Sequence, residues 1–171
     1  MYIIFLGAPG AGKGTQAVYV AQKLSLVHIT TGDLFRQVIE QGAELGIQIK
    51  SYVEKGMLVP NEITIRMVLE HISASDCESG VVFDGFPRNL EQARILDEAL
   101  DKQAETIDRV VYIKVTEEEL LRRLSGRWVC RSCRALYHIL NSPPKVWGKC
   151  NQCGGELYQR PDDTDEVVEK R

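Results

Sequence analysis

The sequence lacks the features that mark membrane-spanning, secreted and nucleic-acid-binding proteins. No apolar run approaches the roughly 20 residues that a membrane-spanning helix needs. The N-terminus has no basic segment and enters a strand-like run at once, so we expect no signal peptide. Lysine and arginine total 21 against 24 aspartates and glutamates, and the formal net charge of −3 leaves no general basic surface for nucleic acid. We therefore expect a cytoplasmic protein with neither a membrane nor nucleic acid as a partner.

The cysteines are too few and too regularly spaced for a disulfide framework. Two Cys-x2-Cys pairs, Cys130 with Cys133 and Cys150 with Cys153, are separated by sixteen residues. This spacing is typical of a zinc ribbon, and four thiolates fill a tetrahedral ion completely, so the zinc would be structural. Two disulfides are disfavoured in a cytosolic chain. Iron can bind the same four cysteines, so it stays open as an alternative to zinc. Cys77 is expected to be a small buried apolar residue.

A glycine-rich loop follows the first apolar run, 2–6. Residues 7–15 read GAPGAGKGT, and a helix pattern begins directly after them. A strand, a glycine loop and a helix N-terminus form a phosphate cradle from free backbone amides, the helix dipole and Lys13. The spacing Gly-x4-Gly-Lys is that of a P-loop, although Gly14 replaces the usual hydroxyl residue and the hydroxyl comes one place later, at Thr15. The loop therefore predicts a nucleoside triphosphate site.

Strand patterns alternate with helix patterns over most of the chain. We predict strands at 2–6, 27–33, 80–84 and 109–115, and helices at 17–24, 34–40, 43–53, 61–72, 92–100 and 117–124. This order predicts an α/β fold of three layers, with a central parallel sheet and ligands at the carboxyl ends of its strands. The 171 residues and 44% hydrophobic content suit one compact domain. From residue 126 the chain is turn-rich, which indicates a separate β module.

Three polar features refine this outline. Asp84 ends an apolar strand beside the P-loop, and a carboxylate in that place suits the outer shell of a magnesium ion; without the P-loop we would read it as a turn residue. Asn89 with Gln92, and Thr116 with Glu119, have the spacing of helix-capping pairs.

Six motifs occur in the order seen in adenylate kinases. They are GAPGAGKGT at 7–15, TGD at 31–33, GxxVP at 56–60, DGFPR at 84–88, RxxGR at 123–127 and RxDD at 160–163. The match extends from end to end, and the DGFPR block is highly specific. The sequence therefore resembles the bacterial adenylate kinases with a zinc-binding lid, within the P-loop nucleoside monophosphate kinases.

The resemblance implies reversible Mg²⁺-dependent transfer, ATP + AMP = 2 ADP, by a monomer with a structural Zn²⁺. It implies a P-loop core of residues 1–29, 60–125 and 164–171, a helical AMP-binding insertion at 30–59, and a zinc-ribbon-like β lid at 126–163. Family members continue for several tens of residues past this end, so we expect a C-terminally truncated sequence with an uncovered sheet edge.

Site residues follow from the same resemblance, position by position. ATP is expected at Gly10, Ala11, Gly12, Lys13, Gly14, Thr15, Arg123, Arg127, Leu136 and Tyr137. AMP is expected at Thr31, Arg36, Met57, Leu58, Val59, Gly85, Phe86, Pro87, Arg88, Gln92, Arg160 and Arg171. The catalytic cations would be Lys13, Arg88, Arg123, Arg127, Arg160 and Arg171. Thr15 and Asp84 would lie around the magnesium ion, and Cys130, Cys133, Cys150 and Cys153 would bind zinc. Asn61, usually Asp in the family, and Asn89, where Thr is common, are mild departures.

Phosphate chemistry gives the arginines an independent reason. The acceptor is itself a phosphate, mostly dianionic at neutral pH, so it needs no general base. Two unit charges 4 Å apart repel by about 4 kcal/mol at an effective dielectric of about 20, and guanidinium groups suit the neutralising role. Two alternatives remain: a kinase for another nucleoside monophosphate, against which Gln92 and the long lid argue, and a catalytically weak ATP-binding zinc-ribbon protein.

Overall fold

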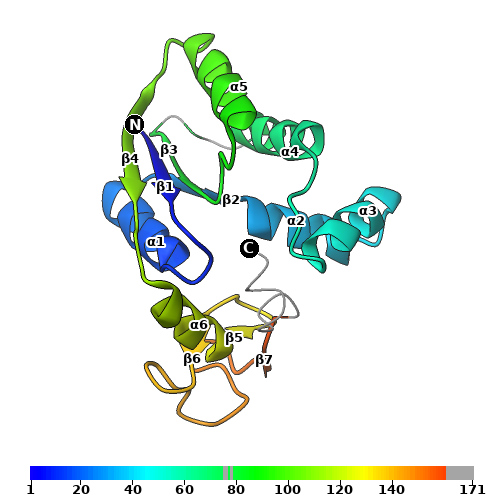
Figure 1. Cartoon of the computed structure of the whole chain (residues 1–171), viewed down its shortest axis with the longest axis vertical. Helices are drawn as coiled ribbons and strands as arrows, with labels where there is room; N and C mark the ends of the chain where they lie inside the picture. Colours follow the sequence, from blue (N-terminus) through cyan, green and yellow to red (C-terminus); the bar gives the residue numbers. More distant parts are fainter. Residues whose placement is uncertain (75–76, 78, 161–171) are drawn as a thin grey trace.

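Apolar strands and amphipathic helices build two sheets in the computed structural model (Figure 1), which describes residues 1–74, 77 and 79–160. The elements are β1 (Tyr2–Leu6), α1 (Lys13–Leu24), β2 (Val27–Thr30), α2 (Thr31–Glu40), α3 (Glu44–Val53), α4 (Asn61–Ala74), β3 (Val81–Asp84), α5 (Leu90–Asp101), β4 (Ile107–Tyr112), α6 (Glu117–Ser125), β5 (Arg127–Cys130), β6 (Leu136–His138) and β7 (Leu157–Tyr158). None of these helices is both long and apolar enough to cross a bilayer.

The larger sheet has the strand order β2-β3-β1-β4, and all of its pairings are parallel. The predicted parallel sheet is thereby confirmed. Because parallel strands end at one edge, the loops after β1, β2 and β3 meet there. The P-loop, the start of α2 and Asp84 are therefore neighbours in space.

Side chains alternate between the two faces of this sheet. Ile3 and Phe5 pack against the small residues Ala17 and Ala21 of α1. Ile4, between them in sequence, packs on the opposite face in a cluster with α4 and α5. Figure 1 shows α1 on one side of the strands and α4 and α5 on the other. The predicted three layers are confirmed.

Two smaller units have apolar clusters of their own. Phe35 of α2, Ile49 of α3 and Val59 form one cluster, beside the main core. The second sheet, of order β6-β5-β7, is antiparallel and encloses another cluster that contains Tyr137 and Leu157. The turn-rich β module is confirmed, and it lies at one end of the molecule (Figure 1).

Helix capping was predicted correctly once and wrongly once. Asn89 is the N-cap of α5, and its side chain accepts a hydrogen bond from the backbone N–H of Gln92. Thr116 stands at the N-cap of α6 but makes no side-chain capping bond. The expected partner, Glu119, instead accepts hydrogen bonds from Arg122 and Arg123, because two guanidinium groups outcompete one backbone amide for a carboxylate.

Two further element bounds differ from the sequence prediction. Residues 31–33, predicted as extended, form the first turn of α2, where the Asp33 carboxylate suits the positive helix end. β4 covers 107–112 rather than 109–115, and the Asp108 carboxylate accepts a hydrogen bond of 2.7 Å from the N–H of Tyr2.

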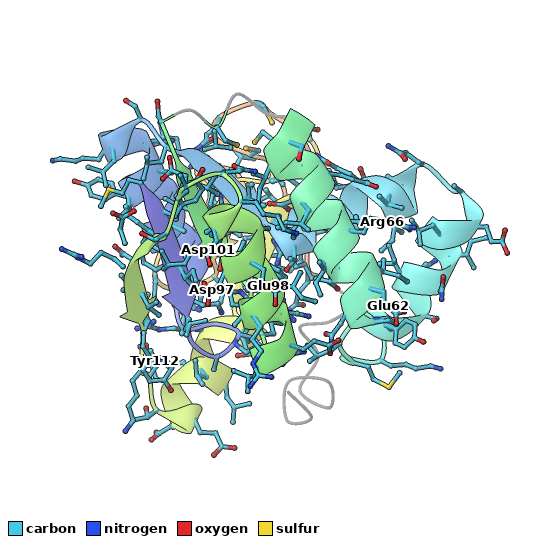
Figure 2. All side chains as sticks on the ribbon, turned by 90° about the horizontal axis from the view of Figure 1, so that it is seen from above. Glu62, Arg66, Asp97, Glu98, Asp101 and Tyr112 are labelled. Atoms are coloured by element: carbon cyan, nitrogen blue, oxygen red, sulfur yellow. The ribbon has the colours of Figure 1, made fainter. Side chains whose placement is uncertain are left out.

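The outer faces of the sheet and its helices differ in character. Figure 2 looks onto α4 and α5, whose exposed sides carry charged residues such as Arg66 and Asp97. β4, which pairs with β1, instead exposes apolar groups, with Val110 57% and Tyr112 67% accessible. Among the described strands, β4 is therefore an edge strand of the larger sheet.

The contribution of α5 to the core is testable with two leucines of the same helix. Leu100 is 1% exposed and Leu90 is 67% exposed. We expect Leu100→Ala to lower the free energy of unfolding by about 2–5 kcal/mol, because it removes buried methyl groups and leaves a cavity. Leu90→Ala should change it by less than about 0.5 kcal/mol. Urea denaturation of both variants checks this, and equal effects would contradict the packing described.

Candidate active site

The P-loop joins β1 to α1 by a glycine-dependent path. Gly10 and Gly12 have φ of +80° and +97°, a region that suits glycine. A Cβ on Gly10 would lie 2.7 Å from Leu124 Cγ, so the loop also packs tightly against α6. Lys13 begins α1, and its ammonium donates to the Ala8 carbonyl at 3.0 Å, which lays the lysine back over the loop. The local geometry is that of an anion cradle.

Asp84 faces the start of α1 from the end of β3. A Cβ placed on Gly14 would lie 3.0 Å from Oδ2 of Asp84, so a side chain at the position after Lys13 would crowd this carboxylate. Burial raises the pKa of the Asp84 carboxyl, although the nearby charge of Lys13 opposes the shift. Burial likewise lowers the pKa of the Lys13 ammonium, and there Asp84 opposes the shift. Both groups therefore lose part of their hydration in a site built for charge.

His28 was not singled out from the sequence. It lies on β2, beside β3, and burial lowers the pKa of its imidazole while Asp84 and Asp33 act to raise it. Its Nε2 is buried and has no hydrogen-bond partner among the described residues. Nothing in the sequence distinguishes it from an ordinary strand residue.

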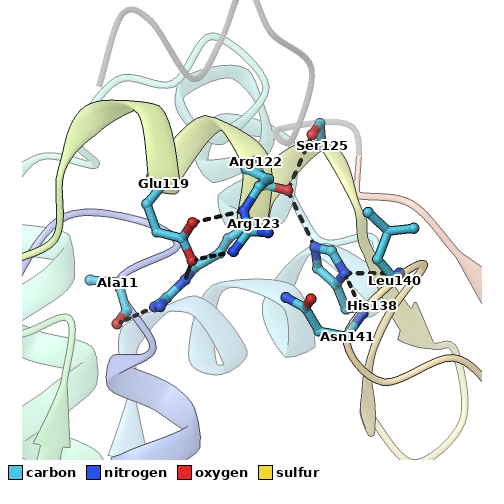
Figure 3. Close-up of polar contacts among 8 residues, drawn as sticks. All are labelled: Ala11, Glu119, Arg122, Arg123, Ser125, His138, Leu140 and Asn141. Carbon is cyan, nitrogen blue, oxygen red and sulfur yellow. Dashed lines mark hydrogen bonds and ion pairs between the residues drawn. The ribbon is translucent and has the colours of Figure 1, made fainter.

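The end of α6 brings arginines to the P-loop, as expected for Arg123 (Figure 3). Arg123 donates from Nη1 to the Ala11 carbonyl at 3.3 Å and from Nε to Glu119 at 2.7 Å. Glu119 also accepts from Arg122 at 2.7 and 3.0 Å. Hydrogen bonds from Arg122, then Arg123, hold the pKa of the partly exposed Glu119 carboxyl at about 2. Arg127 lies close enough to lower the pKa of Lys13.

His138 ties the β module to the same helix end (Figure 3). Its Nδ1 accepts the backbone N–H groups of Leu140 and Asn141, each at 3.1 Å. The proton must therefore be on Nε2, which lies 3.2 Å from the Arg122 carbonyl and donates to it. The ring fills the space where a side chain at Gly126 would be.

The other half of the expected site surrounds Gly85. The Thr31 hydroxyl donates to the Gly85 carbonyl at 3.0 Å, and Arg88 Nε donates to the same oxygen at 2.8 Å. Gln92, 1% exposed, accepts from the backbone N–H of Arg88 at 2.8 Å. Arg36 is paired with Asp33 one turn along α2. Two of these predicted residues, Thr31 and Arg88, thus share the Gly85 carbonyl, and Gln92 is joined to them through the backbone of Arg88.

Several other residues predicted to bind AMP differ in how far they are buried. Phe86 is 1% exposed and packs against Phe83, so its side chain belongs to the core; its bond to Pro87 is cis. Val59 is also buried, whereas Met57 and Leu58 are each 50% exposed.

Two more predicted residues lie toward the end of the chain. Arg160, partly buried, is the last described residue. Arg171, together with 164–171 of the expected core, lies outside the described residues.

The four predicted cysteines form one cluster, with all Sγ atoms within 4.8 Å of one another. Each pair is folded in the same turn, in which the first cysteine's carbonyl accepts the N–H four residues later, from Arg134 and from Gly154. Cys130 Sγ lies 3.4 Å from Cys153 Sγ, and Cys133 Sγ lies 3.5 Å from Cys150 Sγ. Four sulfurs around a tetrahedral ion at about 2.3 Å are about 3.8 Å apart, so the cluster suits such an ion.

Tyr137 supports the cluster instead of pointing its side chain at a nucleotide. Its hydroxyl accepts from the Asn151 N–H at 2.7 Å and donates to Cys150 Sγ at 3.3 Å. That bond is the main cause that lowers the pKa of the Cys150 thiol to about 6. Tyr137 is buried, while the neighbouring Leu136, also predicted to contact ATP, is 45% exposed.

An ion pair that the sequence did not suggest joins the β module to α2. Arg134, beside the cysteine cluster, donates from Nη2 to Glu40, and its Nη1 lies 3.4 Å from the Tyr158 hydroxyl. The two partners are 94 residues apart in sequence. No local pattern marks such a pair. The contact brings together the two segments expected to move over the substrates.

Comparison with known proteins agrees with these observations. The family model described as "Adenylate kinase" matches residues 5–171. An adenylate kinase of Dehalococcoides mccartyi is 60% identical over 169 residues, covering 99% of this chain and 78% of that protein. Those of Caldicellulosiruptor bescii and Archaeoglobus fulgidus are 48% and 50% identical, each over 100% of this chain and 80% and 79% of their own lengths.

The raised pKa of Asp84 predicts a stability effect with a definite sign. A carboxyl whose pKa is higher in the folded state binds protons more tightly there, so stability falls as pH rises from the unfolded pKa to the folded one. We expect Asp84→Asn to raise the free energy of unfolding at pH 7 by about 1 kcal/mol. The gain in stability should vanish near pH 3, where the Asp84 carboxyl is protonated in both the folded and the unfolded protein.

Urea denaturation at the two pH values measures this difference. Asp97→Asn, on the exposed side of α5, is the control and should change neither value. A loss of stability at pH 7 in Asp84→Asn would contradict the charge assignment.

Proposed function

The chain belongs to the adenylate kinase family, and we propose that the site at the carboxyl edge of its sheet carries out the family's reaction with the residues named below. The protein is a phosphotransferase that catalyses ATP + AMP = 2 ADP, with Mg²⁺ bound to ATP. One observation supports the assignment most directly. The P-loop cradle and the group around Gly85 lie at the same sheet edge, so a donor and an acceptor phosphate can face each other. The adenylate kinase names of the relatives do not favour either alternative function.

ATP would occupy the P-loop side. The amides of the loop and Lys13 would hold the β- and γ-phosphates, and Arg123 already lies against the loop through the Ala11 carbonyl. Thr15 and Asp84 would hold water around Mg²⁺, which fits a half-buried carboxylate facing the first turn of α1. Bound magnesium supplies neutralising charge to the triphosphate.

AMP would occupy the side between α2 and α5. Thr31, Arg36 and Arg88 would hold its phosphate, because two arginines and a hydroxyl lie around the Gly85 carbonyl and the first turn of α2. Gln92 would hydrogen-bond the base. Arg160 and Arg171 are proposed to reach the transferring phosphates.

The reaction itself requires positioning of the two phosphates and neutralisation of their negative charge more than it requires proton transfer. The AMP phosphate is the nucleophile and carries its negative charge at neutral pH, so the protein must overcome repulsion between two anions. Lys13 and the arginines supply fixed cations at the sheet edge. Lys13 and Arg123 lie against the P-loop, so little reorganisation would be needed during transfer.

Closure of two segments would keep water from competing with AMP. We assign residues 30–59 as the AMP-binding insertion and 126–163 as the lid, on a core of 1–29, 60–125 and 164–171. The pair between Arg134 and Glu40 connects insertion and lid directly. A structural zinc on the four cysteines would make the lid rigid, since its own cluster is small. Family membership and the net charge of −3 support a monomer in the cytoplasm with no nucleic-acid or membrane partner.

Lys13 is the residue on which the function depends most directly. With ADP and Mg²⁺ supplied, we expect equal amounts of ATP and AMP to form, measured by chromatography. Lys13→Ala should lower this rate by about 10²–10³-fold, because a cation at the developing charge is lost. Lys23→Ala, exposed at the other end of α1, is the matched control and should keep the full rate. Unchanged turnover in Lys13→Ala would reject the proposed site.

The zinc proposal predicts a separable lid. Metal analysis should find one zinc per chain, and Cys150→Ser or chelation should release it. Without the metal, we expect protease cleavage between residues 126 and 160 while 1–125 stays resistant, because the β module has little core of its own. Cys77→Ser, outside the cluster, is the control. Iron in place of zinc, or an unaltered cleavage pattern, would refute it.

A further inference from the structure

Three side-chain amides meet where α4 and α5 begin. Oδ1 of Asn61 accepts hydrogen bonds from Asn89 Nδ2 and from Gln92 Nε2, both at 2.8 Å. On its other side, Nδ2 of Asn61 donates to the carboxylate of Glu91. Asn61 is therefore the common partner in the group.

The orientation of the Asn61 amide is fixed by its partners. An ionised carboxylate only accepts hydrogen bonds, so Glu91 must meet the NH2 end of Asn61. Asn89 confirms the same orientation from the other side: its Oδ1 accepts the backbone N–H of Gln92 at 2.9 Å, which leaves its NH2 end for Asn61. The oxygen of Asn61 is thereby directed at Gln92.

Gln92 is held in turn from both ends of its amide. Oε1 accepts the backbone N–H of Arg88 at 2.8 Å, and Nε2 donates to Asn61 at 2.8 Å. Turning this amide over would set a donor against a donor and an acceptor against an acceptor, in a side chain that is 1% exposed. Unmatched buried polar groups are costly, so Gln92 keeps one orientation.

A fixed glutamine amide distinguishes purines by their donor and acceptor order. One N–H and one lone pair of Gln92 remain after the bonds to Asn61 and Arg88. Adenine presents an amino donor beside a ring-nitrogen acceptor, which this amide can match. A 6-oxopurine presents the reverse order, a carbonyl beside a ring N–H, and needs the amide turned over.

We propose that Asn61, fixed by Glu91, is a positioning residue that sets the Gln92 amide and thereby selects adenine over 6-oxopurines in the monophosphate acceptor. The inference rests on the proposed function, in which Gln92 faces the base of AMP. Asn61 acts through Gln92 and touches no reacting atom. Its effect belongs to acceptor selectivity, not to the transfer step.

The test compares AMP with IMP as acceptors for MgATP. We expect Asn61→Ala to lower kcat/KM for AMP about tenfold through a higher KM, while kcat stays within about twofold. The reason is the loss of one neutral hydrogen bond that orients the Gln92 amide. The ratio of kcat/KM for AMP over IMP should fall by the same factor. Asn61→Asp keeps an acceptor oxygen toward Gln92 and should retain the ratio, especially when Glu91→Gln removes the facing charge.

Further variants separate the possible failures. Glu91 is exposed, so Glu91→Ala leaves the fold intact and should lower the ratio by freeing the Asn61 amide, whereas Glu98→Ala on the same helix should not. If Gln92→Ala lowers the ratio but Asn61→Ala and Glu91→Ala do not, the inference is wrong and Asn61 is structural. If Gln92→Ala also leaves the ratio unchanged, the proposed acceptor site itself is wrong.

Discussion

Several cations lie at one sheet edge, and they repel one another when no substrate phosphate is bound. Much of the surrounding structure reduces this repulsion. Three of these basic groups have an acid nearby: Asp84 for Lys13, Glu119 for Arg123, and Asp33 for Arg36. The acids keep the cations from repelling one another and leave them oriented. On the proposed function, binding of phosphates would exchange one set of partners for another, which requires smaller movements than assembling the cations anew.

The two smaller units of the fold are each packed around residues of their own. The unit around Ile49 and the β module each contain a small apolar cluster in addition to the clusters on the two faces of the sheet. His138 links the β module to the Arg122 carbonyl, next to the arginine that contacts the P-loop. The contact between the β module and α6 is therefore adjacent to the P-loop. A partly exposed pair such as Arg134 with Glu40 adds little stability by itself.

Local patterns explain which parts of this structure could be predicted from the sequence. Strand alternation, the glycine loop and the cysteine spacing each depend on neighbours in the chain, and the structure contains all three as predicted. The capping box at Thr116 failed because Glu119 had a choice between a local amide and two arginines. The side chain of Tyr137 and the pairing of Arg134 depend on segments far away in sequence, for which one sequence has no signal.

Hydrogen-bond direction is a further property that residue identity does not reveal. Asn61 and Asn89 were noted as mild departures from a family in which Asp and Thr are common, yet in the structure they contact each other and Gln92. A carboxylate at position 61 would repel Glu91, whereas an amide donates to it and still presents an oxygen to Gln92. The asparagine at 61 is therefore matched to the glutamate at 91, and the effect of either residue depends on the presence of the other. A departure from a family pattern is best judged with the partners that compensate for it.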